Sequence, residues 1–110
     1  MPIDTAKQRE NLALAYGNAA THVAAHSTDP GNTGTGEISG TRKSVIWTPG
    51  TVDGVITATV TLDIPSGATV GGIGLWDAAS GGNYLDGGTV TAQAYSANGT
   101  YTITLTYTQN

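Results

Sequence analysis

Two stretches of this chain alternate strictly between apolar and polar side chains, and this alternation constrains the fold more than any other feature. Between Val55 and Ile64 one set of alternate residues is entirely aliphatic and the other is mainly threonine. From Tyr101 to Thr108, large apolar residues alternate with threonine at every even position. A period of two places the apolar side chains on one face of a β-strand. We therefore expect two strands, the first with these inward side chains: Ile56, Ala58, Val60, Leu62 and Ile64.

Shorter β-forming stretches lie between turn sequences that are rich in glycine and proline. The strands predicted in this way are Arg42–Thr48, Val70–Asp77, Tyr84–Asp86 and Thr89–Tyr95, with residues 21–26 compatible with one more. Asn98-Gly99 predicts a two-residue hairpin turn that leads into the last strand. Short strands with frequent turns are typical of an antiparallel β-sandwich or jelly-roll-like fold, so the chain is expected to be mainly β.

One helix is expected within the first twenty residues. Thr5 can cap it, because Gln8 follows at the spacing of a capping box. A narrow apolar stripe recurs at helical spacing and consists of Leu12, Tyr16, Ala19, Ala20 and Val23. Gly17 weakens such a helix by about 1 kcal/mol relative to alanine, so the helix needs a surface to lie on. That surface is expected on the body of the protein or on a neighbouring copy.

A long Gly/Thr-rich loop is expected between the helix and the strands. Residues Ser27–Gly40 are dense in turn-forming residues and have no apolar face. We interpret this segment as a mobile arm that becomes ordered across a neighbouring subunit. The chain is accordingly expected to be one domain, residues 1–110, with a helix and arm at 1–40 and a β-sandwich body at 41–110.

Charge is scarce and unevenly distributed. Only 11% of the residues are charged, and the formal net charge of −4 lies entirely in residues 44–110, which have no lysine or arginine. Nucleic acids and anionic lipids are bound through clustered basic residues, so neither is an expected partner. No apolar stretch approaches a membrane span, and no signal-peptide core follows Met1, so synthesis in the cytoplasm is expected. The absence of cysteine excludes disulfides and thiolate sites.

The motifs predict no catalytic, cofactor or metal site. His22 and His26 are four residues apart, but the residues between them do not form a zincin motif. On a strand the two rings would lie about 13 Å apart, too far to share one ion, so we interpret them as surface or interface histidines. The aspartates flank turns, where a carboxylate accepts hydrogen bonds from nearby backbone. The glycine-rich stretches lack the Lys-Ser/Thr pair and the helix of a phosphate loop.

The two tryptophans leave more than one interpretation open. Trp47 is in register with Val45 and is expected to face the core, and burial is also the commoner case for Trp76. An exposed Trp76 would instead anchor an interface or provide a stacking platform for a carbohydrate. The low number of carboxylates favours the interface anchor over the carbohydrate platform.

Two blocks of sequence resemble a known family. The first comprises Ala24–Gly31 and Gly40–Trp47, and the second joins Asp63–Val70 to Ile73–Gly82, with Gly-Leu-Trp-Asp-Ala as its most specific part. Together they are similar to small structural virion proteins of tailed bacteriophages, particularly phages of actinobacteria, which are often described as tail-fibre-like or minor structural proteins. The resemblance implies a place in the virion and a structural, non-enzymatic role without cofactors.

The length of the chain favours one role within that family. Because it has no internal repeat and no spare length for a fibre shaft, the leading hypothesis is a capsid (head) decoration protein. A tail-tip or tail-fibre-associated adhesin is the alternative, and a small carbohydrate-binding module is a third. The expected partners are other copies of the chain, as a homotrimer, and the major capsid protein or another virion protein. The interface candidates are Leu12, Tyr16, Ala19, Val23 and Trp76.

Overall fold

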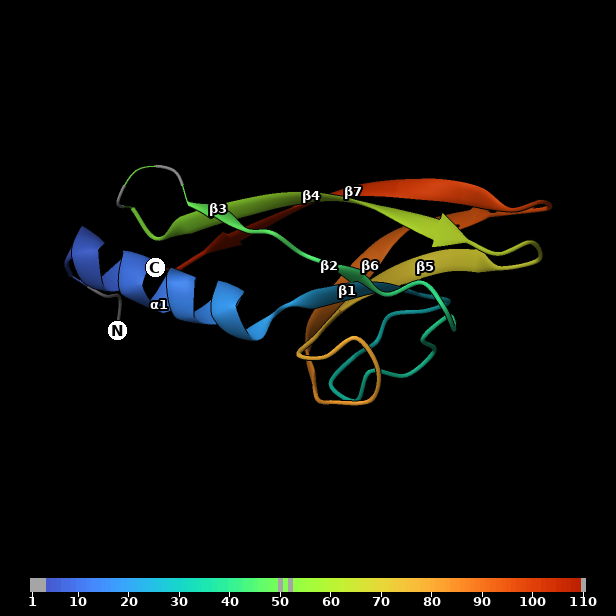
Figure 1. The fold of residues 1–110 in the computed structure, drawn as a ribbon, viewed down its shortest axis with the longest axis horizontal. Helices are drawn as coiled ribbons and strands as arrows, with labels where there is room; N and C mark the ends of the chain where they lie inside the picture. The colour runs from blue at the N-terminus through green and yellow to red at the C-terminus, as the bar shows by residue number, and fades with distance from the viewer. Residues whose placement is uncertain (1–3, 50, 52, 110) are drawn as a thin grey trace.

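The computed structural model of the protein describes residues 4–49, 51 and 53–109. These residues form one helix and two antiparallel sheets. In chain order the elements are α1 (Ala6–Ala19), β1 (His22–His26), β2 (Lys43–Ser44), β3 (Thr48–Pro49), β4 (Val55–Ile64), β5 (Thr69–Trp76), β6 (Tyr84–Ala94) and β7 (Gly99–Thr108). The first sheet has the strand order β2-β1-β5-β6, and the second has the order β3-β4-β7 (Figure 1).

One face of the second sheet is covered partly by the helix and partly by the first sheet. In Figure 1, β4 and β7 run along the upper side, with α1 below one end of them and β1 and β5 below the other part. The core between these layers is aliphatic, and its largest fully buried members are Ile56, Leu62, Ile64, Val23 and Val70. This arrangement confirms the expected fold class, a mainly β antiparallel sandwich with one N-terminal helix.

The two strictly alternating stretches pair with each other. β4 and β7 are in register from Val55 opposite Thr108 to Ile64 opposite Gly99, without interruption. In β4 the five side chains expected to point inward are buried, and the threonines between them are exposed. In β7 the large apolar side chains are half-buried and the threonines are exposed. Both strands and the faces predicted for them are confirmed.

The single strand predicted at Arg42–Thr48 is wrong, because this segment contributes to both sheets. Its first part, β2, pairs with β1, whereas β3 pairs with β4 in the other sheet. The link between them crosses from one layer to the other, which a continuous strand within one sheet cannot do. The predicted orientation of its side chains is confirmed, since Val45 is buried and Ile46 is 83% exposed.

The hairpin turn predicted at Asn98-Gly99 is also wrong. The two-residue turns favoured in hairpins need positive φ at the first central residue or at both, but neither Asn98 nor Gly99 has one. Because β6 and β7 belong to different sheets, the chain between them changes layer instead of reversing within a sheet. The N–H of Tyr95 fixes this crossing by donating to the carbonyl of Ala68 at 2.9 Å. β6 itself continues through Gly87-Gly88 as one strand, where two strands were expected.

Helix α1 begins as predicted and packs against its own chain. The hydroxyl of Thr5 accepts a hydrogen bond from the N–H of Gln8 at 3.2 Å. The helix ends at Ala19, so Val23 lies in β1 and belongs to the core rather than to a helical stripe. Gly17 allows a close approach to the second sheet, because a Cβ atom there would lie only 2.9 Å from Ile56 Cδ1.

A buried carboxylate fastens the same helix near its start. Glu10 is only 5% exposed, and its Oε1 atom accepts a hydrogen bond from the N–H of Gly54 at 3.0 Å. Hydrogen bonds to an ionised group are stronger than those between neutral groups, and removal of a buried partner is costly. This hydrogen bond therefore fastens the helix to the turn before β4.

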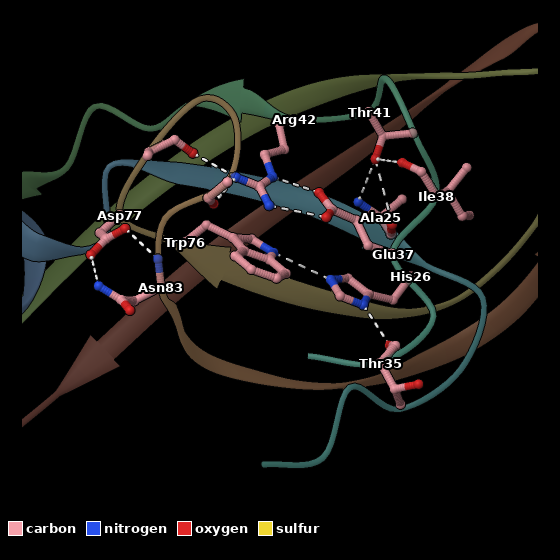
Figure 2. A network of polar contacts seen from close by, with 12 residues as sticks. Ala25, His26, Thr35, Glu37, Ile38, Thr41, Arg42, Trp76, Asp77 and Asn83 are labelled. Carbon is pink, nitrogen blue, oxygen red and sulfur yellow. Dashed lines mark hydrogen bonds and ion pairs between the residues drawn. The ribbon is translucent and has the colours of Figure 1, made fainter. Parts of the chain in front are cut away.

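The mobile arm predicted at Ser27–Gly40 is folded against the first sheet of the same chain. The N–H of Ser27 donates to Gly36 O at 2.8 Å, and the N–H of Ile38 donates to Ala25 O at 2.9 Å. Thr41 closes the loop, since its hydroxyl donates to Ile38 O at 2.7 Å (Figure 2). The loop also buries one apolar side chain completely, that of Pro30, and the sequence did not predict this burial.

Candidate functional site

Five side chains from distant parts of the sequence meet beside the first sheet, and we call them the Trp76 cluster. Figure 2 shows four of them, with the indole of Trp76 between an arginine–glutamate pair and a histidine. The fifth, Tyr84, lies edge-on to Trp76 with ring centres 5.4 Å apart. The members are His26, Glu37, Arg42, Trp76 and Tyr84, which come from β1, the 27–40 loop, the segment before β2, β5 and β6.

His26 is fully buried and hydrogen-bonded through both ring nitrogens. Its Nδ1 atom lies 2.8 Å from Thr35 O, and the indole N–H of Trp76 donates to its Nε2 atom at 3.4 Å. Both contacts fit a neutral imidazole with its proton on Nδ1, because a carbonyl only accepts and an indole N–H only donates. Gly74 makes room for the ring, since a Cβ atom there would lie 2.3 Å from Nε2.

The interpretation of His26 as a surface or interface residue is therefore wrong. The 27–40 loop covers the ring, although the sequence predicted this loop to be a mobile arm. His22, on the same strand, is half-buried and its Nδ1 atom contacts the hydroxyl of Thr21 at 2.9 Å.

Arg42 joins two loops and stacks on Trp76. Its guanidinium carbon lies 4.0 Å from the centre of the indole ring, the geometry of a cation–π contact. Its Nε and Nη2 atoms donate to the two carboxylate oxygens of Glu37 at 2.5 and 3.0 Å, a bidentate pair. Its Nη1 atom donates to the carbonyls of Ala78 and Gly81 at 2.9 and 2.8 Å. The guanidinium thus fixes the 27–40 loop and the turn between β5 and β6 to each other.

The turn between β5 and β6 is closed by its own aspartate. The N–H of Asn83 donates to Asp77 Oδ1 at 2.7 Å, and its side-chain amide donates to Oδ2 at 3.0 Å (Figure 2). The backbone hydrogen bond from Asn83, followed by the side-chain one, lowers the pKa of Asp77 below its usual value. The prediction that this aspartate serves a turn is confirmed.

The five predicted interface residues are placed in different environments. Leu12 and Ala19 are exposed on α1, and Val23 is fully buried in the core of its own chain. Trp76 is half-buried, with one ring face under Arg42. Tyr16 is also half-buried: its ring stacks on Tyr107 and its hydroxyl donates to Asp86 at 2.7 Å. Val23 is therefore unavailable to a partner in this conformation, because no part of its side chain reaches the surface.

An exposed apolar surface beside the helix was not recognised from the sequence. Leu14 is 39% exposed and lies with Ile46 and Trp47 around a shallow groove between α1 and the β2–β3 link. We call Leu14, Ile46 and Trp47 the α1–β3 patch. Large aliphatic side chains that stay in water beside one another are typical of an interaction surface. The alternation of Val45 with Ile46 could have indicated an outward isoleucine, but not its position beside the helix.

Metal-ligating side chains do not gather in the part of the chain that the structure describes. Residues 4–49, 51 and 53–109 contain no group of three histidine or acidic side chains that could hold a metal ion. None of the helical structure in these residues is long and apolar enough to cross a membrane. The polar side chains of the Trp76 cluster are instead occupied by one another and by loop carbonyls.

The fold and the Trp76 cluster define a small β-sandwich in which polar side chains fasten the loops. A family model with the description Podophage GP4 fiber I protein gp80 (Gp80) matches residues 11–108, which is nearly the whole chain. The chain belongs to this family, and it is thus a phage fibre protein and part of the virion. Comparisons with curated proteins and with solved structures gave no significant match. The resemblance to structural virion proteins of tailed phages is confirmed.

Proposed function

We propose that the protein is a non-enzymatic component of the phage fibre that acts in attachment to the host, as a tail-tip or fibre-associated adhesin. The observation that carries this proposal is the match of a fibre-protein family over residues 11–108. It favours the fibre alternative over the leading hypothesis from the sequence, a capsid decoration protein. That hypothesis depended on the lack of a shaft, and a short chain can also be one component of a fibre that contains other proteins.

The α1–β3 patch is the surface that we assign to contact with the neighbouring fibre protein. It is apolar, and the groove beside it is lined on α1 by Leu14, Gly17 and Asn18. Burial of such side chains on association removes apolar surface from water, the main driving force of most protein–protein contacts. Leu12 and Ala19, two of the residues proposed from the sequence, are exposed on the same helix. They lie two and five positions from Leu14 and therefore on a different side of the helix, outside the α1–β3 patch.

A shallow depression at the far end of the elongated molecule is the surface that we assign to the receptor. The molecule measures 48 Å along its longest axis, and Figure 1 shows the helix at one end and the β4–β5 and β6–β7 turns at the other. The depression is lined by carboxylate, amide and hydroxyl groups, from Asp63, Asn98, Thr100 and Ser39. Groups of these types can hydrogen-bond the hydroxyls of a cell-surface glycan.

Immunogold labelling of purified virions tests the location. We expect gold particles over the fibres, with a copy number per virion far below that of the major capsid protein. Gold distributed over the heads, with a copy number comparable to that of the capsid protein, would instead support capsid decoration.

Substitution of the α1–β3 patch tests the attachment surface. Ile46→Asp should prevent incorporation into virions, because it places a charge where the proposal requires apolar contact. Leu85→Asp is a matched control, since Leu85 is also an exposed aliphatic side chain (41%) but lies on β6. Equal incorporation of both variants would show that the patch does not hold the protein on the particle. These variants do not test the homotrimer expected from the sequence.

A further inference from the structure

The last strand, β7, has one free edge that is unusually well suited to pairing with another strand. In the sheet order β3-β4-β7 the strand is bonded on one side only. Its ten residues pair with β4 without a bulge, and it contains no charged residue and no proline. Native proteins normally protect long edge strands with charges, prolines or bulges, because unpaired backbone groups are a template for another chain. β7 has none of these devices.

The other long edge strand of the sandwich provides a direct contrast. β6 ends the first sheet, and its pairing with β5 is shifted at two places, between Val70 and Gly72 and between Leu75 and Trp76. It also carries a charged side chain, Asp86, and the consecutive glycines Gly87-Gly88. Irregular register and charge make an edge a poor template. Within the described residues, the protection is thus present on β6 and lacking on β7.

The sequence of β7 is a near-palindrome centred on Thr104. From Thr100 to Thr108 it reads Thr-Tyr-Thr-Ile-Thr-Leu-Thr-Tyr-Thr, so the order of residue types is almost the same in both directions. If two copies pair antiparallel around a twofold axis at Thr104, each threonine faces a threonine and each tyrosine faces a tyrosine. Ile103 of one copy then faces Leu105 of the other. Aromatic, aliphatic and Thr–Thr cross-strand pairs of this kind stabilise sheets.

The backbone groups at this edge point in the direction that such pairing needs. The N–H of Gln109 donates to Gly54 O at 2.9 Å, which is a bond to the β4 side. Because backbone groups alternate along a strand, those of the odd-numbered β7 residues face β4 and those of the even-numbered threonines face the free edge. The hydroxyl of Tyr95 donates to Thr100 O at 2.8 Å, as expected for a carbonyl that faces away from β4. The carbonyls and N–H groups of Thr102, Thr104 and Thr106 remain available to a partner strand.

The side chains of β7 already pair in the required way on the other side. On the outer face, the hydroxyls of Thr59 and Thr104 lie 3.4 Å apart, and those of Thr61 and Thr102 lie 3.0 Å apart. A second β7 would repeat this threonine pairing across the free edge. On the inner face, the half-buried Ile103 and Leu105 border an apolar groove between the sheets, together with residues that include Ile73 and Val90. The partner strand would place its own Ile103 and Leu105 beside that groove.

We infer that the free edge of β7 is a self-association surface, which pairs antiparallel with β7 of a second copy of this chain around a twofold axis at Thr104. The inference goes beyond the proposed function, because it specifies how copies pair and does not depend on the receptor or on the α1–β3 patch. A twofold contact uses the same surface on both copies and closes on itself. It therefore gives a dimer, in place of the homotrimer that the sequence suggested.

Charge substitution at the edge tests the inference with the isolated full-length protein. Analytical ultracentrifugation of the wild type should show a dimer, and Thr104→Lys should be a monomer at the same concentration, because two lysines would face each other across the axis. Thr59→Lys is the matched control: it is the cross-strand partner of Thr104, loses the same hydroxyl contact and lies away from the edge. This control should remain dimeric, and circular dichroism should show that both variants are folded.

A cross-linking experiment tests the register independently. The natural chain has no cysteine, so Thr104→Cys introduces a unique thiol that would face its own copy across the axis. Directly opposite residues of an antiparallel pair lie within the Cα–Cα range of a disulfide. Mild oxidation should convert Thr104→Cys, but not Thr59→Cys, to a covalent dimer on a non-reducing gel.

The possible outcomes separate this inference from the proposed function. A wild-type monomer, a wild-type trimer, or equal behaviour of the two lysine variants would overturn the β7 pairing. Pairing with a strand of another fibre protein would appear as a wild-type monomer and is included in that result. None of these outcomes affects the fibre location, which depends on labelling of virions.

Discussion

The ring of Tyr16, on the N-terminal helix, stacks on the ring of Tyr107, near the end of the last strand, with centres 3.7 Å apart and planes inclined by 12°. The hydroxyl of Tyr16 also donates to Asp86, on β6, and its ring lies edge-on to Trp47. One side chain of the helix therefore contacts both sheets. Of the two surfaces expected for the helix, the body of its own chain and a neighbouring copy, the structure shows the first.

Loss of the contacts that Tyr16 makes from the helix should therefore destabilise the protein. We expect Tyr16→Ala to lower the free energy of unfolding by about 2–3 kcal/mol, through loss of aromatic burial and of one hydrogen bond. Tyr16→Phe keeps the stacked ring and should cost only about 1 kcal/mol. Urea denaturation measures both values. If deletion of residues 1–20 left stability unchanged, the helix would not contribute to the folded body.

Alkaline pH should weaken the protein through the same side chain. Burial, followed by the hydrogen bond to Asp86, raises the pKa of Tyr16 above its ordinary value of 10.0. The neutral phenol is thus favoured by folding, so its contribution is fully present below pH 10.0 and decreases as the pH rises above that value. Unfolding curves at increasing pH should show this loss, and Tyr16→Phe should show a smaller one. Identical pH dependence in the two proteins would contradict the assignment.

Leu62 should be one of the most sensitive positions in the core. It is fully buried on β4, opposite Tyr101 on β7, and Leu62→Ala leaves a cavity that costs about 2–5 kcal/mol. Thr61→Ala, on the exposed face of the same strand, should change stability by less than about 1 kcal/mol. Guanidinium denaturation compares the two. A larger effect at Thr61 would mean that the strand is shifted by one residue, since such a shift exchanges its two faces.

Arg42 should stabilise the loops of the Trp76 cluster more than a surface cation does. Arg42→Ala leaves the carboxylate of Glu37 and two loop carbonyls without their donor, and we expect a loss of about 2–3 kcal/mol. Lys43→Ala is the control, because its ion pair with Asp63 is exposed and such pairs contribute about 0–1 kcal/mol. Thermal unfolding followed by tryptophan fluorescence reports both variants, with Trp76 as a local probe. Similar losses for the two would show that Arg42 does not fasten the loops.

Association with the virion should be insensitive to salt. The α1–β3 patch is apolar, so its contact does not depend on charge attraction. An increase from about 0.1 to about 1 M salt shortens the screening length to about 3 Å and would weaken a charge-based contact. Sedimentation of washed virions, with the protein detected in the pellet, measures retention. Release by salt alone would show that charged groups hold the protein in place.

Those parts of the fold that depend on a local period could be predicted from the sequence. The alternation of aliphatic residues with threonine defined β4 and β7, the face that each buries and the mainly β class, because strand geometry places every second side chain on the same side. The capping position of Thr5 was likewise readable from a spacing of three residues. The aspartate-closed turn at Asp77 depended on a similarly local interaction.

Which of these elements meet could not be predicted, because it depends on contacts between distant parts of the chain. The hydrogen bond between Trp76 and His26 joins residues fifty positions apart, and the bond between Tyr16 and Asp86 joins residues seventy positions apart. Burial of His26 depends on a loop whose composition is that of a mobile arm, and the layer change between β2 and β3 depends on partners in two different sheets. Periodicity reports the environment of one face of one element. It contains no information about which distant segment supplies that environment, because that choice depends on the combined packing of all the layers.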